Sequence, residues 1–117
     1  MSGERSYHAG RAAEESVARY YADAGRRVAA RRWRGQGGEI DIVARDGESV
    51  IFIEVKAART HARAAERLGR AQQLRIYDAA AEFLAGEPHG ALTPARFDVA
   101  LVDAMGRVEI LENAFAA

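Results

Sequence analysis

Residues 39–56 read Glu-Ile-Asp-Ile-Val-Ala-Arg-Asp-Gly-Glu-Ser-Val-Ile-Phe-Ile-Glu-Val-Lys, and this stretch decides the fold. Two apolar runs rich in β-branched residues flank Asp46-Gly47, a strong signal for a β-hairpin. The second run is apolar on both faces for most of its length, which is typical of a central strand covered on both sides. Its charged end, Glu54 and Lys56, is costly to bury unless the charges are paired, hydrated in a cleft or bound to a metal ion.

The hairpin also predicts which charged side chains share one face of the sheet. If the turn is centred on Asp46-Gly47, paired residue numbers add up to 93, so that Asp41 faces Phe52 and Glu39 faces Glu54. Asp41 and Glu54 are then diagonal neighbours about 7–8 Å apart, close enough to reach one ion. A slip by one residue would move Asp41 to the opposite face. The side chains expected on this face are Asp41, Glu54 and Lys56, with Glu39 beside them.

Length and composition exclude several classes of protein. The 117 residues are the length of one domain, residues 1–117, with a modest core. Because cysteine is absent, disulfides and thiolate metal sites are excluded. The three histidines have no nucleophile and orienting acid at a recognisable spacing, which disfavours a serine hydrolase. No apolar run approaches the length of a membrane span and no signal peptide is recognisable, so we expect a cytoplasmic protein without membrane association.

The net charge of zero hides an uneven distribution along the chain. Residues 26–75 hold twelve basic and six acidic residues, whereas residues 76–117 hold two and seven. The basic half surrounds the hairpin, which suggests an anionic partner, although scattered solvated arginines explain the charge equally well. Sixteen residues are Arg and only Lys56 is Lys. A compact ammonium with an adjustable pKa suits chemistry at this position, and chance is the alternative.

The rest of the chain predicts an α/β protein, with a sheet covered by helices. The glycine-rich loop after the first strand suits either a tight turn or contact with a phosphate. The strand after the long helix can return parallel to the Glu54 strand, and we expect the last strand to be antiparallel to it. The predicted elements are a helix over 8–24 that stops at Gly25, a strand over 28–33, the loop 34–38, the hairpin strands, a long helix over 63–84, and strands over 96–103 and 108–111.

An Asp, a turn and then Glu-x-Lys on the next strand resemble the PD-(D/E)xK nuclease superfamily, with Asp41 as the first acid and Glu54-Val55-Lys56 as the E-x-K element. More closely, Gly-Gly-Glu-Ile-Asp-Ile-Val-Ala-Arg-Asp-Gly, Ile-Phe-Ile-Glu-Val-Lys and Arg-Phe-Asp-Val, in this order, resemble the uncharacterised YraN family, which is similar to archaeal Holliday-junction resolvases. The resemblance covers nearly the whole chain. It implies a restriction-endonuclease-like core, with a mixed sheet of about five strands flanked by helices in the order α-β-β-β-α-β-β.

The resemblance also implies roles for individual residues. Glu14 matches an acid that such nucleases place beside the metal, although Ala13 stands where a glycine is expected, and surface charge is the alternative reading of Glu14. Gln73 and Tyr77 resemble the Gln-x-x-x-Tyr element of RecB-like relatives. The basic residue that relatives place at the start of the long helix corresponds here to Gln72 or Arg75. The predicted nucleic-acid contacts are Arg32, Arg34, Gly38, Glu39, Gln73 and Tyr77.

These residue types suit metal-dependent hydrolysis of a phosphodiester bond. Asp41, Glu54 and the backbone carbonyl of Val55, together with waters, suit an octahedral Mg²⁺ or Mn²⁺. Lys56 would stabilise the developing charge or orient the attacking water. DNA, branched or flapped, is the substrate that the resemblance implies, and cleavage of a two-fold junction would need a homodimer. Two alternatives stay open: a nucleic-acid-binding module with an inactive nuclease-like site, and a structural Glu54–Lys56 salt bridge with Asp41 capping a turn.

Overall fold

The computed structural model describes residues 3–115, and the side chains of residues 10–115. Five strands form one mixed sheet in the order β1-β2-β3-β4-β5, in which only β3 and β4 run parallel. This confirms the predicted α/β class, the mixed five-stranded sheet and the parallel return of the strand after the long helix. The elements are α1 (Gly3–Asp23), β1 (Arg27–Arg34), β2 (Glu39–Asp46), β3 (Ser49–Ala57), α2 (His61–Ala65), α3 (Arg70–Ala85), the 3-10 helix η1 (Gly90–Leu92), β4 (Ala95–Val102) and β5 (Val108–Leu111).

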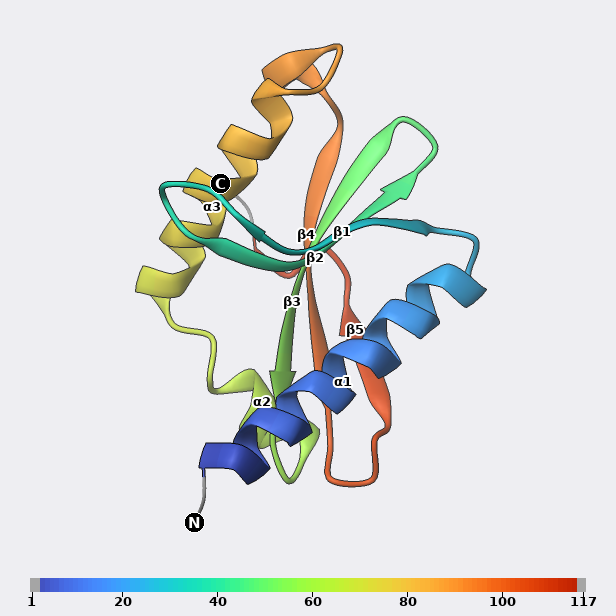
Figure 1. Cartoon of the computed structure of the whole chain (residues 1–117), viewed down its shortest axis with the longest axis vertical. Coiled ribbons are helices and arrows are strands. Elements are labelled where there is room, and N and C mark those ends of the chain that lie inside the picture. The colour runs from blue at the N-terminus through green and yellow to red at the C-terminus, as the bar shows by residue number, and fades with distance from the viewer. Residues whose placement is uncertain (1–2, 116–117) are drawn as a thin grey trace.

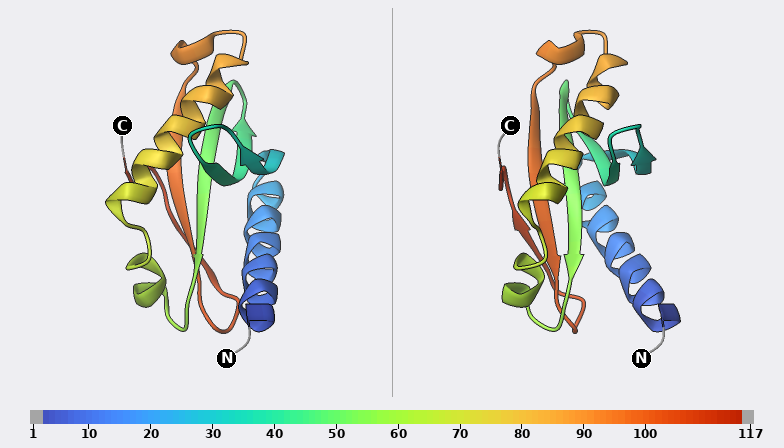
Figure 2. Two further views of the ribbon diagram at one scale, coloured as in Figure 1. Left: turned by 60° about the vertical axis from the view of Figure 1, so that its left-hand side comes forward. Right: turned by 90° about the vertical axis from the view of Figure 1, so that its left-hand side faces the viewer.

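Helices cover both faces of the sheet, with α1 on one face and α3 on the other (Figures 1 and 2). Each face has its own hydrophobic cluster, because alternate residues of the central strands point to opposite sides. The cluster between α1 and the sheet consists of Ala13, Val17, Tyr21, Ile42, Ala44, Ile51, Ile53, Ala100 and Val102. The cluster between α3 and the sheet consists of Ile40, Val43, Val50, Phe52, Ile76, Ala79 and Ala80. The two-sided burial of β3 confirms that it is a covered central strand.

The single long helix predicted over 63–84 is wrong, because two helices, α2 and α3, replace it. The Thr60 hydroxyl caps α2 by accepting a hydrogen bond from the Arg63 amide at 3.1 Å. The helix then stops, and Gly69 adopts an extended backbone with φ −91° and ψ 167° at the start of α3. Glycine is a poor helix former, so the chain changes direction there at little energetic cost. The first helix of the chain, α1, begins at Gly3 rather than at residue 8. It ends before Gly25, as predicted, and Gly25 has φ +81°.

The hairpin register also differs from the prediction, by two residues. The closing pair is Asp46 with Ser49, so paired numbers add up to 95 and the turn residues are Gly47 and Glu48. Gly47 has φ +62°. A glycine at the first turn position is the requirement of a type II′ hairpin, which explains the shift. Because side chains alternate with period two, a shift of two residues leaves the side chains of the paired stretches, 42–46 and 49–53, on their predicted faces.

Strand β2 is irregular at Asp41. Ile40 and Ile42 would share a face in a regular strand, yet Ile42 packs beneath α1 and Ile40 beneath α3. The neighbouring strand β1 is irregular at the same level, where Arg32 has φ +51°. A positive φ is uncommon for a residue with a side chain and marks a sharp local change of backbone direction. The β1–β2 ribbon therefore turns at Arg32 and Asp41, and crosses the front of the sheet in Figure 1.

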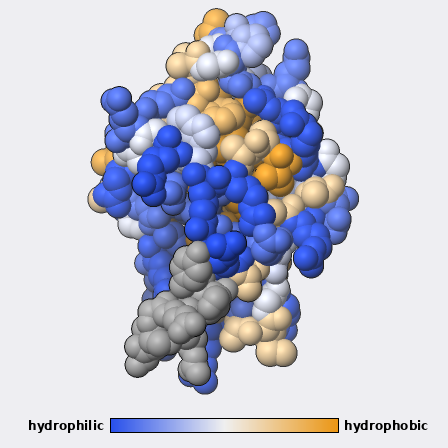
Figure 3. All heavy atoms as spheres, viewed as in Figure 1, coloured by the Kyte–Doolittle hydropathy of each residue, from blue (hydrophilic) through white to orange (hydrophobic). Residues whose placement is uncertain are grey.

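Hydrophilic residues cover most of the face seen in Figure 3, apart from a limited hydrophobic area above its centre. Within the described residues, no helix is both long and apolar enough to cross a membrane.

Candidate active site

Asp41 lies where the ladder between β2 and β3 stops. The last ladder pair is Ile42 with Ile53, so Asp41 and Glu54 are the next residues on each strand. Beyond this pair, the Asp41 side chain rather than a backbone carbonyl accepts the hydrogen bond from β3: Asp41 Oδ2 accepts from the Val55 amide at 2.8 Å. This bond fixes one oxygen of the carboxylate beside Glu54. The structure thus places the two predicted acids as direct rather than diagonal neighbours.

Glu54 is an acid in the hydrophobic centre of the molecule, with only 4% of its surface exposed. Burial raises its pKa from the ordinary 4.5 to about 10, and the hydrogen bond and negative charge of Asp41 act in the same direction. The Lys56 ammonium and the Gln72 amide lower this pKa, but they do not offset the larger effects. The site therefore lacks positive charge for two ionised carboxylates.

Lys56 reaches Glu54 through Gln72, the third residue of α3. The Lys56 Nζ donates to Gln72 Oε1 at 2.8 Å, and the Gln72 Nε2 donates to Glu54 Oε2 at 2.5 Å. The described residues form no direct ion pair between Glu54 and Lys56, so the predicted structural alternative of a simple salt bridge is not the arrangement found. Asp41, Glu54 and Lys56 nevertheless lie close together, and Gln72 of α3 contacts both Glu54 and Lys56.

Glu14, the fourth predicted catalytic residue, does not join these three. It lies on α1 and pairs with Arg32, with 3.0 Å between Glu14 Oε1 and Arg32 Nε. Beside it, Glu15 pairs with Arg31 on the same strand. Among the described residues, no three or more His, Asp or Glu side chains are grouped so that they could hold a metal ion. The catalytic role of Glu14 stays a prediction.

The predicted nucleic-acid contacts each make contacts within the protein, and their role in binding stays a prediction. Arg34 pairs with Glu39 at 2.9 Å on the exposed edge of the β1–β2 ribbon, so Glu39 does not face Glu54. Gln73 accepts a hydrogen bond from Arg70 at 3.4 Å. The ring of Tyr77 packs edge-on against Phe97 with 5.0 Å between ring centroids, and its buried hydroxyl has no partner among the described residues. Tyr77 is thus a partly buried residue of α3 that packs against β4.

The glycine-rich loop 34–38 lies against α3. The backbone amides of Gln36 and Gly37 both donate to the Glu82 carboxylate at 2.8 Å, and these bonds lower the pKa of Glu82. A Cβ on Gly38 would lie 2.9 Å from the carbonyl oxygen of Arg75, closer than real contacts allow. Close approach to the helix therefore explains these glycines, and a carboxylate already occupies the two amides that suited a phosphate.

Asp98 forms a buried polar network that the local sequence pattern does not predict. Its side chain is 0% exposed and accepts hydrogen bonds from the Tyr21 hydroxyl at 2.7 Å, the Arg96 guanidinium at 3.0 Å and the Asn113 amide at 2.9 Å. Burial and the bond to Asp98 raise the pKa of Tyr21. The network ties α1 and the C-terminal segment to β4. One signal could have revealed it: an acid in the otherwise apolar run after Arg96.

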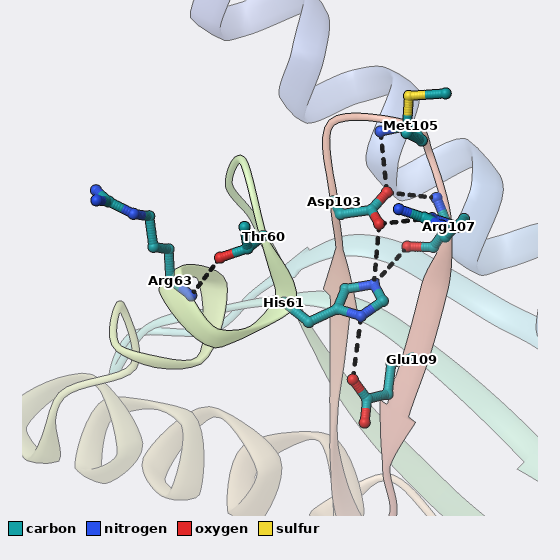
Figure 4. Close-up of polar contacts among 7 residues, drawn as sticks. All are labelled: Thr60, His61, Arg63, Asp103, Met105, Arg107 and Glu109. Atoms are coloured by element: carbon teal, nitrogen blue, oxygen red, sulfur yellow. Dashed lines mark hydrogen bonds and ion pairs between the residues drawn. The ribbon is translucent and has the colours of Figure 1, made fainter.

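A second polar cluster braces the chain just beyond Lys56 (Figure 4). His61, at the start of α2, has Nε2 2.9 Å from the carbonyl oxygen of Arg107 and Nδ1 3.1 Å from Glu109 Oε1. Asp103 accepts hydrogen bonds from the backbone amides of Met105 and Arg107, and the bonds to Arg107 and Met105 lower its pKa. The contacts join α2 to the β4–β5 turn and fix the path of the chain between Lys56 and Gln72.

Exposed arginines lie on the segment that leads to Gln72. Arg63, Arg67 and Arg70, from α2, the break and the first residue of α3, are all exposed. They place positive charge on the surface of the segment that ends at Gln72, whose side chain contacts Glu54 and Lys56.

Comparison with known proteins identifies the relatives of this chain. The model of the uncharacterised protein family UPF0102 matches residues 13–102. A UPF0102 protein of Cereibacter sphaeroides (strain KD131) is 71% identical over 117 residues, which is the full length of both chains. Proteins of the same name from Ruegeria pomeroyi and Dinoroseobacter shibae are 60% and 45% identical, over 97% and 95% of this chain and 92% and 83% of theirs. Their names state no activity.

Proposed function

Because the chain belongs to the uncharacterised protein family UPF0102, the YraN-like family, we propose its function from the geometry of the site. We propose that it is a metal-dependent endonuclease that hydrolyses phosphodiester bonds in DNA. One observation carries the proposal, namely the convergence of Asp41, Glu54 and Lys56 on one face of the sheet at the end of a ladder. Branched or flapped DNA is the substrate class we propose from the resemblance to junction resolvases. We also propose a location in the cytoplasm.

The residues of the site fit a hard divalent cation. Two neighbouring carboxylates are the donors that Mg²⁺ and Mn²⁺ prefer. Burial and the neighbouring Asp41 raise the pKa of Glu54, and the charge of a bound cation would oppose both effects. Since the described residues offer no third acid at this point, water and phosphate oxygens would complete the shell, as is common for Mg²⁺. When bound, the cation would polarise the scissile phosphate and make a bound water more acidic.

The protein's own groups have separate tasks in this proposal. Asp41 is held in one orientation by the Val55 amide, so one carboxylate oxygen stays directed along the strand edge. Lys56 uses one N–H on Gln72 Oε1 and has further N–H groups for a phosphate oxygen or the attacking water. A positioned ammonium stabilises the negative charge that develops during hydrolysis. The exposed arginines of the α2–α3 segment would contact DNA phosphates and orient the strand without reading its sequence.

A second candidate function is a DNA-binding module with an inactive nuclease-like site. Two observations favour it: Glu14 pairs with Arg32 instead of joining the acids, and Gln72 occupies an oxygen of Glu54. In that case the basic segment alone would bind DNA, with an affinity that falls steeply with salt.

A cleavage screen separates the two functions. Linear, nicked, flapped and four-way DNA would be incubated with the protein in Mg²⁺, Mn²⁺ or EDTA, with binding measured by fluorescence anisotropy in parallel. We expect metal-dependent cleavage that Lys56→Ala abolishes while DNA binding and the melting temperature change little. Binding without cleavage in either metal would favour the inactive module. Equal cleavage by Lys56→Ala and the parent would remove Lys56 from the chemistry.

A further inference from the structure

Gln72 is the one side chain among the described residues for which hydrogen bonds to both Glu54 and Lys56 are found. Its orientation follows from its partners: an ammonium can only donate, so the amide oxygen must face Lys56 at 2.8 Å. The amide nitrogen is thereby directed at Glu54 Oε2, at 2.5 Å. Both polar groups of the amide are used, and reversing the amide would lose both hydrogen bonds. The carboxamide is therefore a directional link rather than a space-filling group.

The backbone around Gln72 explains why this link is rigid. Gln72 lies in the first turn of α3, and the helix is anchored to the sheet by its buried residues Ile76, Ala79 and Ala80. Glu54 and Lys56 lie two residues apart on β3, a separation of about 6.5–7 Å along a strand. A side chain from the facing helix can bridge this distance, whereas the two strand residues would have to bend toward each other. The neighbouring Gln73 instead accepts a hydrogen bond from Arg70.

We infer that Gln72 is a positioning residue, which holds the Lys56 ammonium beside Glu54 so that its remaining N–H groups face the scissile phosphate. This inference rests on the proposed nuclease function. Gln72 itself need not touch the substrate. Its loss should lower the rate of the chemical step while leaving DNA binding by the arginines of the α2–α3 segment unchanged.

The single lysine of this chain allows a direct test that does not depend on activity. Protein made with ¹³C,¹⁵N-lysine gives side-chain NMR signals from Lys56 alone. In Gln72→Met, which keeps the length of the side chain but removes both polar groups, we expect the Lys56 Cε–Hε signal to move toward the position of a solvated lysine. Gln73→Met is the matched control, and we expect it to leave the Lys56 signal where it is in the parent.

Kinetics with metal and DNA provide the second measurement. We expect Gln72→Met to lower kcat about tenfold to a hundredfold, the range typical of residues that orient a catalytic group, with KM changed less than about threefold. An unmoved Lys56 signal, or a moved signal with unchanged kcat, overturns the inference. If the parent cleaves no DNA, the proposed function falls instead, and the Lys56 signal alone decides whether Gln72 holds the ammonium.

Discussion

Replacing Glu54 by Gln should make this protein more stable while removing a metal ligand. At pH 7 the unfolded chain carries Glu54 ionised, whereas the folded protein keeps it protonated because its pKa is raised to about 10. Each pH unit between 4.5 and 7 contributes about 1.4 kcal/mol to this difference, so protonating Glu54 costs the fold about 3 kcal/mol at pH 7. A glutamine carries no such cost, since it is neutral and can still accept from Gln72 and donate to Asp41.

The sign of the pH dependence follows from proton binding. Between pH 4.5 and 10 the folded protein binds more protons at Glu54 than the unfolded chain does, so the parent loses stability as pH rises through this range. Urea unfolding in EDTA, followed by circular dichroism from pH 4 to pH 8, should show Glu54→Gln gaining up to about 3 kcal/mol at pH 7 and almost nothing at pH 4. Glu48→Gln, in the exposed hairpin turn, should change stability by less than about 0.5 kcal/mol. A Glu54→Gln protein no more stable than the parent at pH 7 would refute the reasoning.

Three further predictions concern the frame around the site. Asp98→Ala should destabilise the fold by about 2–4 kcal/mol in urea unfolding, because it leaves the buried Tyr21 hydroxyl without its partner and removes the buried carboxylate that pairs with Arg96, whose other acid partner is the exposed Glu112. Gly38→Ala should destabilise it by about 1–3 kcal/mol, since the new methyl group would meet backbone. Two backbone amides lower the pKa of Glu82, so this carboxylate stabilises the fold above its ordinary pKa of 4.5 and loses that contribution as pH falls through the lowered pKa. In Glu82→Gln, the melting temperature should therefore depend less on pH in the acid range.

Controls make these predictions specific. Gly10→Ala adds the same methyl group in α1 where nothing lies within 4 Å, and it should stabilise the helix by about 0.5–1 kcal/mol. A Gly38→Ala protein as stable as Gly10→Ala would show that loop 34–38 is not held against α3. An acid transition unchanged by Glu82→Gln would show that the loop amides do not depend on this carboxylate. A loss below about 1 kcal/mol for Asp98→Ala would contradict a buried network at that position.

The sequence predicts the grouping of Asp41, Glu54 and Lys56 even though it predicts the wrong hairpin register. The turn was placed on Asp46-Gly47, whereas Gly47 and Glu48 form it, and the resulting shift is two residues. Side chains on a strand alternate with period two, so the error in the pairing did not separate Asp41 from Glu54 and Lys56. Glu39 does not join them, because β2 is irregular at Asp41. A long apolar strand bounded by a glycine turn is enough to predict this much.

The features that the sequence analysis missed depend on contacts between distant segments. Gln72 and Gln73 are adjacent and chemically identical, and only the break at Gly69 and the packing of α3 determine which amide faces the sheet. Similarly, the glycine pattern of loop 34–38 fits a phosphate cradle, and only the fold reveals that Glu82 lies against it. Local patterns predict elements and faces, but the partner of a polar group requires the tertiary structure.

The central claim is that Asp41 and Glu54 together hold a divalent cation, and isothermal titration of Mn²⁺ into the metal-free protein tests it most directly. The account predicts one binding event in the parent that is lost in Asp41→Asn, with protons released on binding because Glu54 must ionise. Repeating the titration in buffers of different ionisation enthalpy would measure those protons. Equal heats in the parent and in Asp41→Asn, or no binding by either protein, would contradict the account.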